Sequence, residues 1–128
     1  MPTHEEWLSP SIFVTKWESP LSSEELRLAF GAIYDALEES ENGAHVMFDL
    51  TQSGMIPFNA PYLALKSGFM THPHAGRVAV VGMNIRAEIL ADIVVKVTRR
   101  DILFFPTYDK AREYLQDEVV VPTDNNSP

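Results

Sequence analysis

One short apolar segment in the middle of the chain limits the fold more than any other feature. It consists of Val46, Met47, Phe48 and Leu50, with Asp49 as the single polar interruption. A run of this length and composition is typical of a strand that lies inside a sheet and is covered on both faces. We therefore predict a sheet with helices packed on it.

Strand and helix patterns alternate on both sides of this segment. Further strands are predicted at residues 12–17, 77–82 and 101–105, and residues 6–8 form a hairpin arm against the first of them. Helices are predicted to begin after Ser22, Asn59, Asn84 and Thr107. Strands that alternate with helices through short loops imply parallel pairing through right-handed crossovers. The expected fold is α/β, with a single-layer, mostly parallel sheet of about five strands and helices packed around it.

The first helix has the most complete start signal in the chain. Ser22 is the predicted N-cap, Glu25 is its capping-box partner, and Leu21 with Leu26 forms a hydrophobic staple. The apolar residues that follow recur at helical spacing, so they form one stripe that faces the sheet: Leu26, Ala29, Phe30, Ile33 and Leu37.

The second predicted helix carries more apolar residues than one buried face needs. The helix predicted at residues 60–70 is apolar nearly all round, so it is either sandwiched in the core or exposed at an interface. The helix after Asn84 has one apolar stripe with Leu90 and Val94 beside it. The stripe consists of Ile85, Ile89, Ile93 and Val97.

Length and composition fit one globular domain. The 128 residues are 45% hydrophobic and include no cysteine, which excludes disulfides, zinc-thiolate sites and thiol nucleophiles. We expect one domain at residues 1–121 and a flexible C-terminal tail at residues 122–128. With no long apolar run and no signal-peptide pattern, the expected location is the cytoplasm, without membrane insertion.

The charge of the chain argues against nucleic acid as a partner. A formal net charge of −8 repels phosphate backbones and anionic lipid unless a local basic patch is present. The only candidate patch is at residues 96–100, where Lys96, Arg99 and Arg100 are better explained as complements to a helix dipole.

Three segments together resemble the STAS-domain or SpoIIAA-like superfamily, whose bacterial members include anti-sigma-factor antagonists. They are the strand that ends in Phe48-Asp49-Leu50 before a helix, the strand at residues 77–82 before an amphipathic helix, and the closing strand, turn and helix at residues 102–115. The resemblance implies the SpoIIAA-like βα superhelix and a regulatory module that works through protein contacts. It extends to lipid-carrying SEC14-type domains, although no residue here specifically supports lipid transfer.

The chain departs from the regulatory members at their phosphorylation motif. Those members place an Asp-Ser-Ser-Gly type motif at the helix after the central strand, whereas residues 56–61 here contain no hydroxyl. Asn59 can cap a helix but cannot accept a phosphoryl group, and Ser53 comes too early. The resemblance is therefore to a member without the phosphorylatable serine.

The expected working surface follows the central strand, because the carboxyl ends of parallel strands carry the sites of α/β proteins. The candidate binding surface consists of Asp49, Ser53, Met55, Ile56, Phe58, Asn59 and Tyr62. Asp49 could serve as a general base beside the hydroxyls of Thr51 or Ser53, but a carboxylate at a strand end more often accepts hydrogen bonds from the following loop. Met55, Ile56 and Phe58 fit core positions and a contact surface equally well. We expect no catalytic residues, no cofactor and no enzymatic activity.

Two histidines in the loop at residues 71–76 are the weak candidates for a metal site. His72 and His74 could share a metal, but neither His4 nor His45 is placed as a third ligand. A structural or exposed pair is the favoured interpretation, and we expect the pair to be dispensable for stability.

These observations leave two classes of function. The favoured one is a non-enzymatic binding or regulatory module of STAS-like form that forms a homodimer through the candidate surface and contacts a regulatory protein partner. The alternative is a domain that binds a small lipophilic ligand in a pocket under the second helix, or a metal at His72 and His74. Within one copy, the apolar excess of the second helix could instead be covered by the helix from Ile85 or by residues 119–121.

Overall fold

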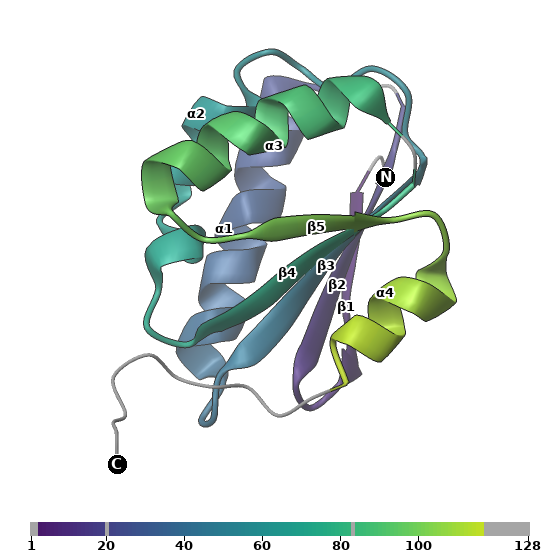
Figure 1. Cartoon of the computed structure of the whole chain (residues 1–128). Helices are drawn as coiled ribbons and strands as arrows, with labels where there is room; N and C mark the ends of the chain where they lie inside the picture. The colour runs from purple at the N-terminus through teal and green to yellow at the C-terminus, as the bar shows by residue number, and fades with distance from the viewer. Residues whose placement is uncertain (1–2, 20, 83, 117–128) are drawn as a thin grey trace.

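The structure, a computed structural model, describes residues 3–19, 21–82 and 84–116 of the chain. Figure 1 shows the elements, which occur in the following order: β1 (Thr3–Ser9), β2 (Ile12–Glu18), α1 (Ser23–Glu39), β3 (Ala44–Gln52), α2 (Ala60–Ser67), the 3-10 helix η1 (Phe69–Thr71), β4 (Ala75–Val81), α3 (Ile85–Thr98), β5 (Ile102–Phe105) and α4 (Tyr108–Tyr114). The predicted tail at residues 122–128 and the segment at residues 119–121 lie outside the described residues.

The strands form one five-stranded sheet in the order β1-β2-β3-β4-β5. β1 pairs with β2 in the antiparallel direction, as predicted for the hairpin arm, and the remaining neighbours pair in parallel. The prediction of a mostly parallel α/β sheet with helices packed around it is therefore confirmed.

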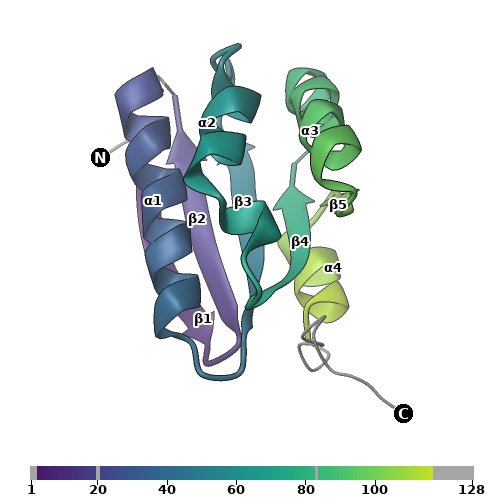
Figure 2. The same cartoon turned by 90° about the vertical axis from the view of Figure 1, so that its left-hand side faces the viewer.

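The helices are divided unequally between the two faces of the sheet. Helices α1, α2 and α3 lie on one face, and α4 lies on the other (Figures 1 and 2). Each face of the sheet has a hydrophobic core cluster, a larger one under α1, α2 and α3 and a smaller one under α4. Residues of β3 contribute to both, because Val46, Phe48 and Leu50 belong to the larger cluster and Met47 to the smaller one. Covered on both faces, this segment has the central position that its composition predicts.

The start of α1 follows the sequence signals closely. The Ser22 side chain accepts a hydrogen bond from the backbone N–H of Glu25, and the Glu25 carboxylate accepts one from the backbone N–H of Ser22. The predicted stripe of this helix is buried: Leu26, Ala29, Phe30, Ile33 and Leu37.

The second helix begins at the predicted residue, Ala60, but ends earlier than predicted. Asn59 occupies the N-cap position of α2, but its side chain makes no capping hydrogen bond. The helix also ends earlier than expected, at Ser67, because Gly68 adopts a left-handed conformation with φ of 80° that residues without glycine's freedom rarely adopt. A 3-10 turn, η1, continues the chain to the loop before β4.

The third helix buries a different face from the predicted stripe. Asn84 caps α3 as expected, accepting a hydrogen bond from the backbone N–H of Ala87. The buried residues are Ala87, Leu90 and Val94, whereas the predicted stripe is exposed: Ile85, Ile89, Ile93 and Val97. The stripe that the sequence pattern identifies is thus not the buried face, and it is an aliphatic face without cover among the described residues.

Candidate functional site

The loop between β3 and α2 lies at the carboxyl edge of the sheet, and its backbone is held from two sides. The N–H of Gly54 donates to Ser19 Oγ at 2.6 Å, directly after β2. From the start of α3, Asn84 Nδ2 donates to the Gly54 carbonyl at 2.9 Å, and Arg86 Nε donates to the Ile56 carbonyl. The loop is therefore anchored to neighbouring elements by side chains that reach its backbone.

Three large side chains project from this anchored segment into solvent. Met55 is 67% exposed, Phe58 is 75% exposed and Tyr62, in the first turn of α2, is 60% exposed. We call these three residues the loop patch. The Arg86 guanidinium lies 3.7 Å from the centroid of the Phe58 ring, a cation–π contact that covers one face of the ring.

Ile56 does not belong to this exposed set. It is only 2% exposed and packs in the larger core cluster beneath the loop. Of the two alternatives for this residue, the structure places it at a core position, because its side chain points inward while its neighbours point outward.

Two of the three polar residues of the candidate surface, Asp49 and Asn59, make hydrogen bonds within the chain. Asp49 Oδ1 accepts hydrogen bonds from the backbone N–H of Thr51 at 3.0 Å and from Thr51 Oγ1 at 2.7 Å, which confirms the interpretation of this carboxylate as a local acceptor. Asn59 Oδ1 accepts a hydrogen bond from Ser23 Oγ at 3.1 Å, so it joins the starts of α1 and α2. Ser53 Oγ is buried and has no hydrogen-bond partner among the described residues.

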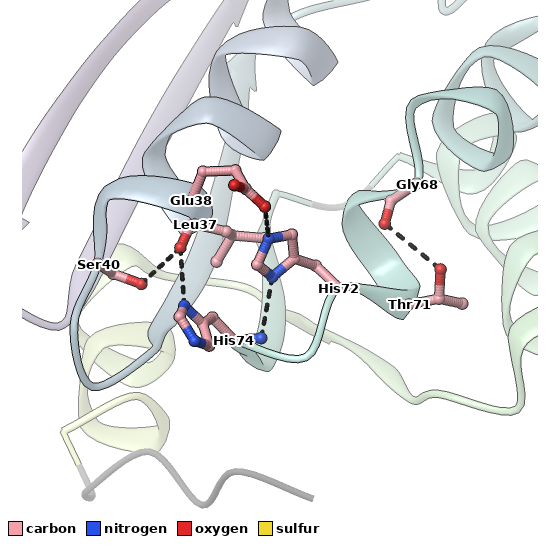
Figure 3. A network of polar contacts seen from close by, with 7 residues as sticks. All are labelled: Leu37, Glu38, Ser40, Gly68, Thr71, His72 and His74. Atoms are coloured by element: carbon pink, nitrogen blue, oxygen red, sulfur yellow. Dashed lines mark hydrogen bonds and ion pairs between the residues drawn. The ribbon is translucent and has the colours of Figure 1, made fainter. Parts of the chain in front are cut away.

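His72 and His74 lie at the opposite edge of the sheet, before β4, and do not meet the loop patch. His72 is buried, and its Nε2 lies 2.6 Å from Oε2 of Glu38. Figure 3 shows the two side chains pointing toward one another. Its Nδ1 accepts a hydrogen bond from the backbone N–H of His74 at 2.9 Å, so the ring proton is on Nε2 and is donated to Glu38. His74 Nδ1 lies 3.1 Å from the Leu37 carbonyl, near the end of α1.

This network assigns the histidine pair a structural role. Both ring nitrogens of His72 are used within the chain, and the described residues contain no group of three or more His, Cys, Asp or Glu side chains placed to hold a metal. The pair ties the loop before β4 to the last turn of α1. Because His72 is buried and both of its ring nitrogens are hydrogen-bonded, its replacement is now expected to lower stability, whereas the sequence alone favoured a dispensable pair.

An apolar cavity of about 80 Å³ lies between the sheet and the three helices that cover one of its faces, α1, α2 and α3. Its walls include Trp17, Phe48, Ile56, Ala64, Leu90 and Phe104. The cavity is lined by α2 and α3, which is the position expected for a lipophilic pocket under the second helix.

Arg86 is a site residue that the sequence analysis missed. It fixes the backbone at Ile56 and contacts the ring of Phe58, although it belongs to a helix far along the chain. The available signal was its position two residues after the N-cap Asn84, next to the carboxyl edge of the sheet where the loop also lies.

The fold and the site define a class: a small α/β domain with a mostly parallel sheet and an anchored, apolar loop at its carboxyl edge. Comparison with known proteins gives that class a family. The SpoIIAA-like family model matches residues 12–116, and the chain belongs to the SpoIIAA-like family. No curated protein and no solved structure gave a significant match. Within the part of the chain that is described, no helix has the length and apolar character needed to cross a membrane.

Proposed function

We propose that this protein is a non-enzymatic regulatory module of STAS-like form that acts through protein contacts, including contact with a second copy of itself. The observation that carries the proposal is the loop patch, in which Met55, Phe58 and Tyr62 project from a backbone held by Ser19, Asn84 and Arg86. Methionine and aromatic residues are enriched in the cores of protein interfaces.

The anchoring of the loop favours binding for an energetic reason. A loop that is already ordered loses little conformational entropy when a partner covers it, so more of the contact energy contributes to affinity. The helix start beside the patch carries Asn59 instead of a hydroxyl residue. The proposed module therefore works without a phosphoryl switch at this position, and the proposal keeps the cytoplasmic location and the absence of nucleic-acid binding expected from the sequence.

Replacing Phe58 with Asp tests the proposal. We expect a dimer of the unmodified protein to become a folded monomer, with the dimer dissociation constant raised by at least about 30-fold, because the contact loses the Phe58 ring and has to remove a hydrated carboxylate from water among apolar side chains. The new carboxylate lies beside Arg86, so the isolated domain tolerates it. Sedimentation velocity measures the association, and circular dichroism checks the fold.

Leu28→Asp is the matched control, since Leu28 is also an exposed apolar residue but lies on α1. It is expected to leave the dimer intact. Sedimentation of the unmodified protein as a monomer at a concentration on the order of 50 µM would rule the dimer out, and equal loss of association in both variants would show that the loop patch has no special role.

A second candidate function is the binding of a small lipophilic ligand, which the apolar cavity under α2 favours. At about 80 Å³ the cavity is suited to a group of a few carbon atoms, since an engineered apolar cavity of about 150 Å³ holds benzene. Xenon, which also enters such cavities and is smaller than benzene, is therefore a suitable probe, with binding followed by chemical-shift changes of methyl groups that line the cavity.

Filling the cavity separates a binding site from a simple packing defect. If the cavity binds the probe, Ala64→Val is expected to abolish saturable shifts while the protein stays folded, and Ala32→Val, outside the cavity lining on α1, is expected to keep them. The absence of saturable shifts in the unmodified protein would remove this alternative.

A further inference from the structure

Helix α3 exposes an aliphatic ridge that its own fold does not use. We call Ile85, Ile89, Ile93 and Val97 the α3 stripe; each is between 45% and 76% exposed. The residues recur at every fourth position, so they form a continuous i±4 row along the helix surface. The helix already packs on the domain through Ala87, Leu90 and Val94. The stripe is therefore additional apolar surface, and solvent exposure of four such side chains in one row is typical of a contact site.

The α3 stripe adjoins the loop patch. Arg86 follows the first residue of the stripe and lies over the ring of Phe58, 3.7 Å from its centroid. The two apolar surfaces therefore meet at the N-terminal end of α3, and one partner can cover both.

The charges beside the stripe change sign along the helix. Glu88 is exposed in the first turns of α3, and Lys96 and Arg99 are exposed at its C-terminal end. Asp92, in between, forms an ion pair with Lys96 at 2.8 Å. The partly buried Arg86, in the first turn, is turned to the loop, where it donates to the Ile56 carbonyl and lies over the Phe58 ring. Apart from the Asp92–Lys96 pair, the exposed charges beside the stripe are thus an acid in its N-terminal half and bases at its C-terminal end.

We propose that the α3 stripe packs against the α3 stripe of a second copy, with the two helices antiparallel about a two-fold axis. This inference rests on the proposed self-association and names the helix at its centre. An antiparallel arrangement brings Glu88 of each copy to the Lys96 and Arg99 end of the other, whereas a parallel one would place like charges together. Rows of i±4 residues from both helices interdigitate at a crossing angle of about −50°.

Charge also distinguishes a second copy from other occupants. Acidic and basic side chains both border the stripe, and the acid of one copy faces the bases of the other when the second helix runs in the opposite direction. A partner that carries charges of one sign only would gain no net attraction from this border. The formal charge of −8 on the whole chain repels anionic lipid and also a second copy, but only the second copy brings a row of matching bases and acids that offsets this repulsion locally. The surface therefore fits its own copy better than it fits a membrane.

A pair of charge-reversed variants tests the arrangement. Glu88→Lys makes both ends of the stripe basic, and the double variant Lys96→Glu with Arg99→Glu makes both ends acidic. Each variant alone is expected to show a dimer dissociation constant raised by about 10-fold or more, because like charges meet across the axis. An equimolar mixture of the two is expected to restore association as a heterodimer. Sedimentation velocity with one variant fluorescently labelled measures this, and thermal melting checks that each variant is folded.

The outcomes separate this inference from the proposed function. Restoration of association in the mixture supports the antiparallel α3 contact. If both variants dimerise as the unmodified protein does while Phe58→Asp does not, the α3 arrangement is overturned and the loop patch stands as the contact. If Phe58→Asp dimerises and the charge variants do not, the loop patch fails and α3 stands. A monomeric unmodified protein overturns both, and binding of the same sample to anionic vesicles would then assign the stripe to a membrane surface.

Discussion

At the scale of single residues, Gly76 shows how one strand limits the next. A Cβ atom at this position would lie 2.5 Å from Nδ1 of His45, on the adjacent strand β3, and 3.1 Å from the carbonyl oxygen of Ala44. The His45 ring is itself held in place, because Nδ1 accepts a hydrogen bond from the backbone N–H of Arg77 at 2.8 Å. The absence of a side chain at Gly76 is therefore needed for the buried His45 to reach the β4 backbone.

Gly76→Ala is expected to lower the free energy of unfolding by about 2 kcal/mol, because neither the ring of His45 nor the backbone of Ala44 can move without losing contacts. Urea denaturation followed by circular dichroism measures the change. The matched control is Gly31→Ala in α1, where nothing lies within 4 Å of the added atom. That control should gain up to about 1 kcal/mol from helix propensity. A neutral Gly76→Ala variant would contradict the role assigned to the His45 contact.

At the scale of elements, the features that were predicted correctly are those that depend on interactions between residues close in the sequence. The capping box at Ser22 and Glu25, the caps Asn84 and Thr107, and the hairpin arm before β2 depend on groups within a few residues of one another. The closing strand and helix also appear where expected. Such signals can be predicted because the interacting groups are close together in the sequence, so they meet whatever the tertiary structure is.

The orientation of α3 could not be predicted in the same way. Two apolar rows run along this helix, one through Ala87, Leu90 and Val94 and one through the bulkier α3 stripe. Side-chain size alone favours burial of the larger row, yet the smaller row packs on the domain. The choice depends on the neighbouring α2 and on β5, whose positions are set by tertiary structure rather than by the sequence of α3.

The candidate site was predictable in place but not in detail. The carboxyl edge of the central strand was identified from the topology rule, and Met55 and Phe58 are exposed there. Ile56 differs from them only in direction, which depends on the loop's hydrogen bonds to Asn84 and Arg86. Those donors come from a distant part of the chain, so no local pattern reveals them.

At the scale of the whole molecule, the sheet divides the protein into two unequal cores. The larger core joins three helices to one face, and aromatic contacts among Trp17, Phe30, Phe48 and Phe69 run through it. On the other face, the described residues place one short helix, α4, over a smaller cluster. Arg77 adds a hydrogen bond to the Tyr114 carbonyl at 2.7 Å and a contact with its ring. The unequal cores imply unequal local stability.

We expect native-state hydrogen exchange to divide the molecule along this boundary. Backbone amides of α4 are expected to exchange through a local opening with a lower free energy and a weaker urea dependence than amides of α1, which exchange through global unfolding. The reason is that opening α4 exposes only the smaller cluster, whereas releasing α1 exposes the larger one.

Two matched variants make this expectation specific, since Leu37 in the larger cluster and Leu115 in the smaller one are both fully buried. Leu37→Ala is expected to lower the protection of α1 by about 3 kcal/mol and leave that of α4 unchanged, because the open state of α4 keeps the packing of Leu37. Leu115→Ala removes a contact that both openings break, so it lowers the protection of α1 and α4 together. If Leu37→Ala weakened both helices equally, α4 and α1 would open as one cooperative unit, and the sheet would not act as a boundary between two separately opening parts.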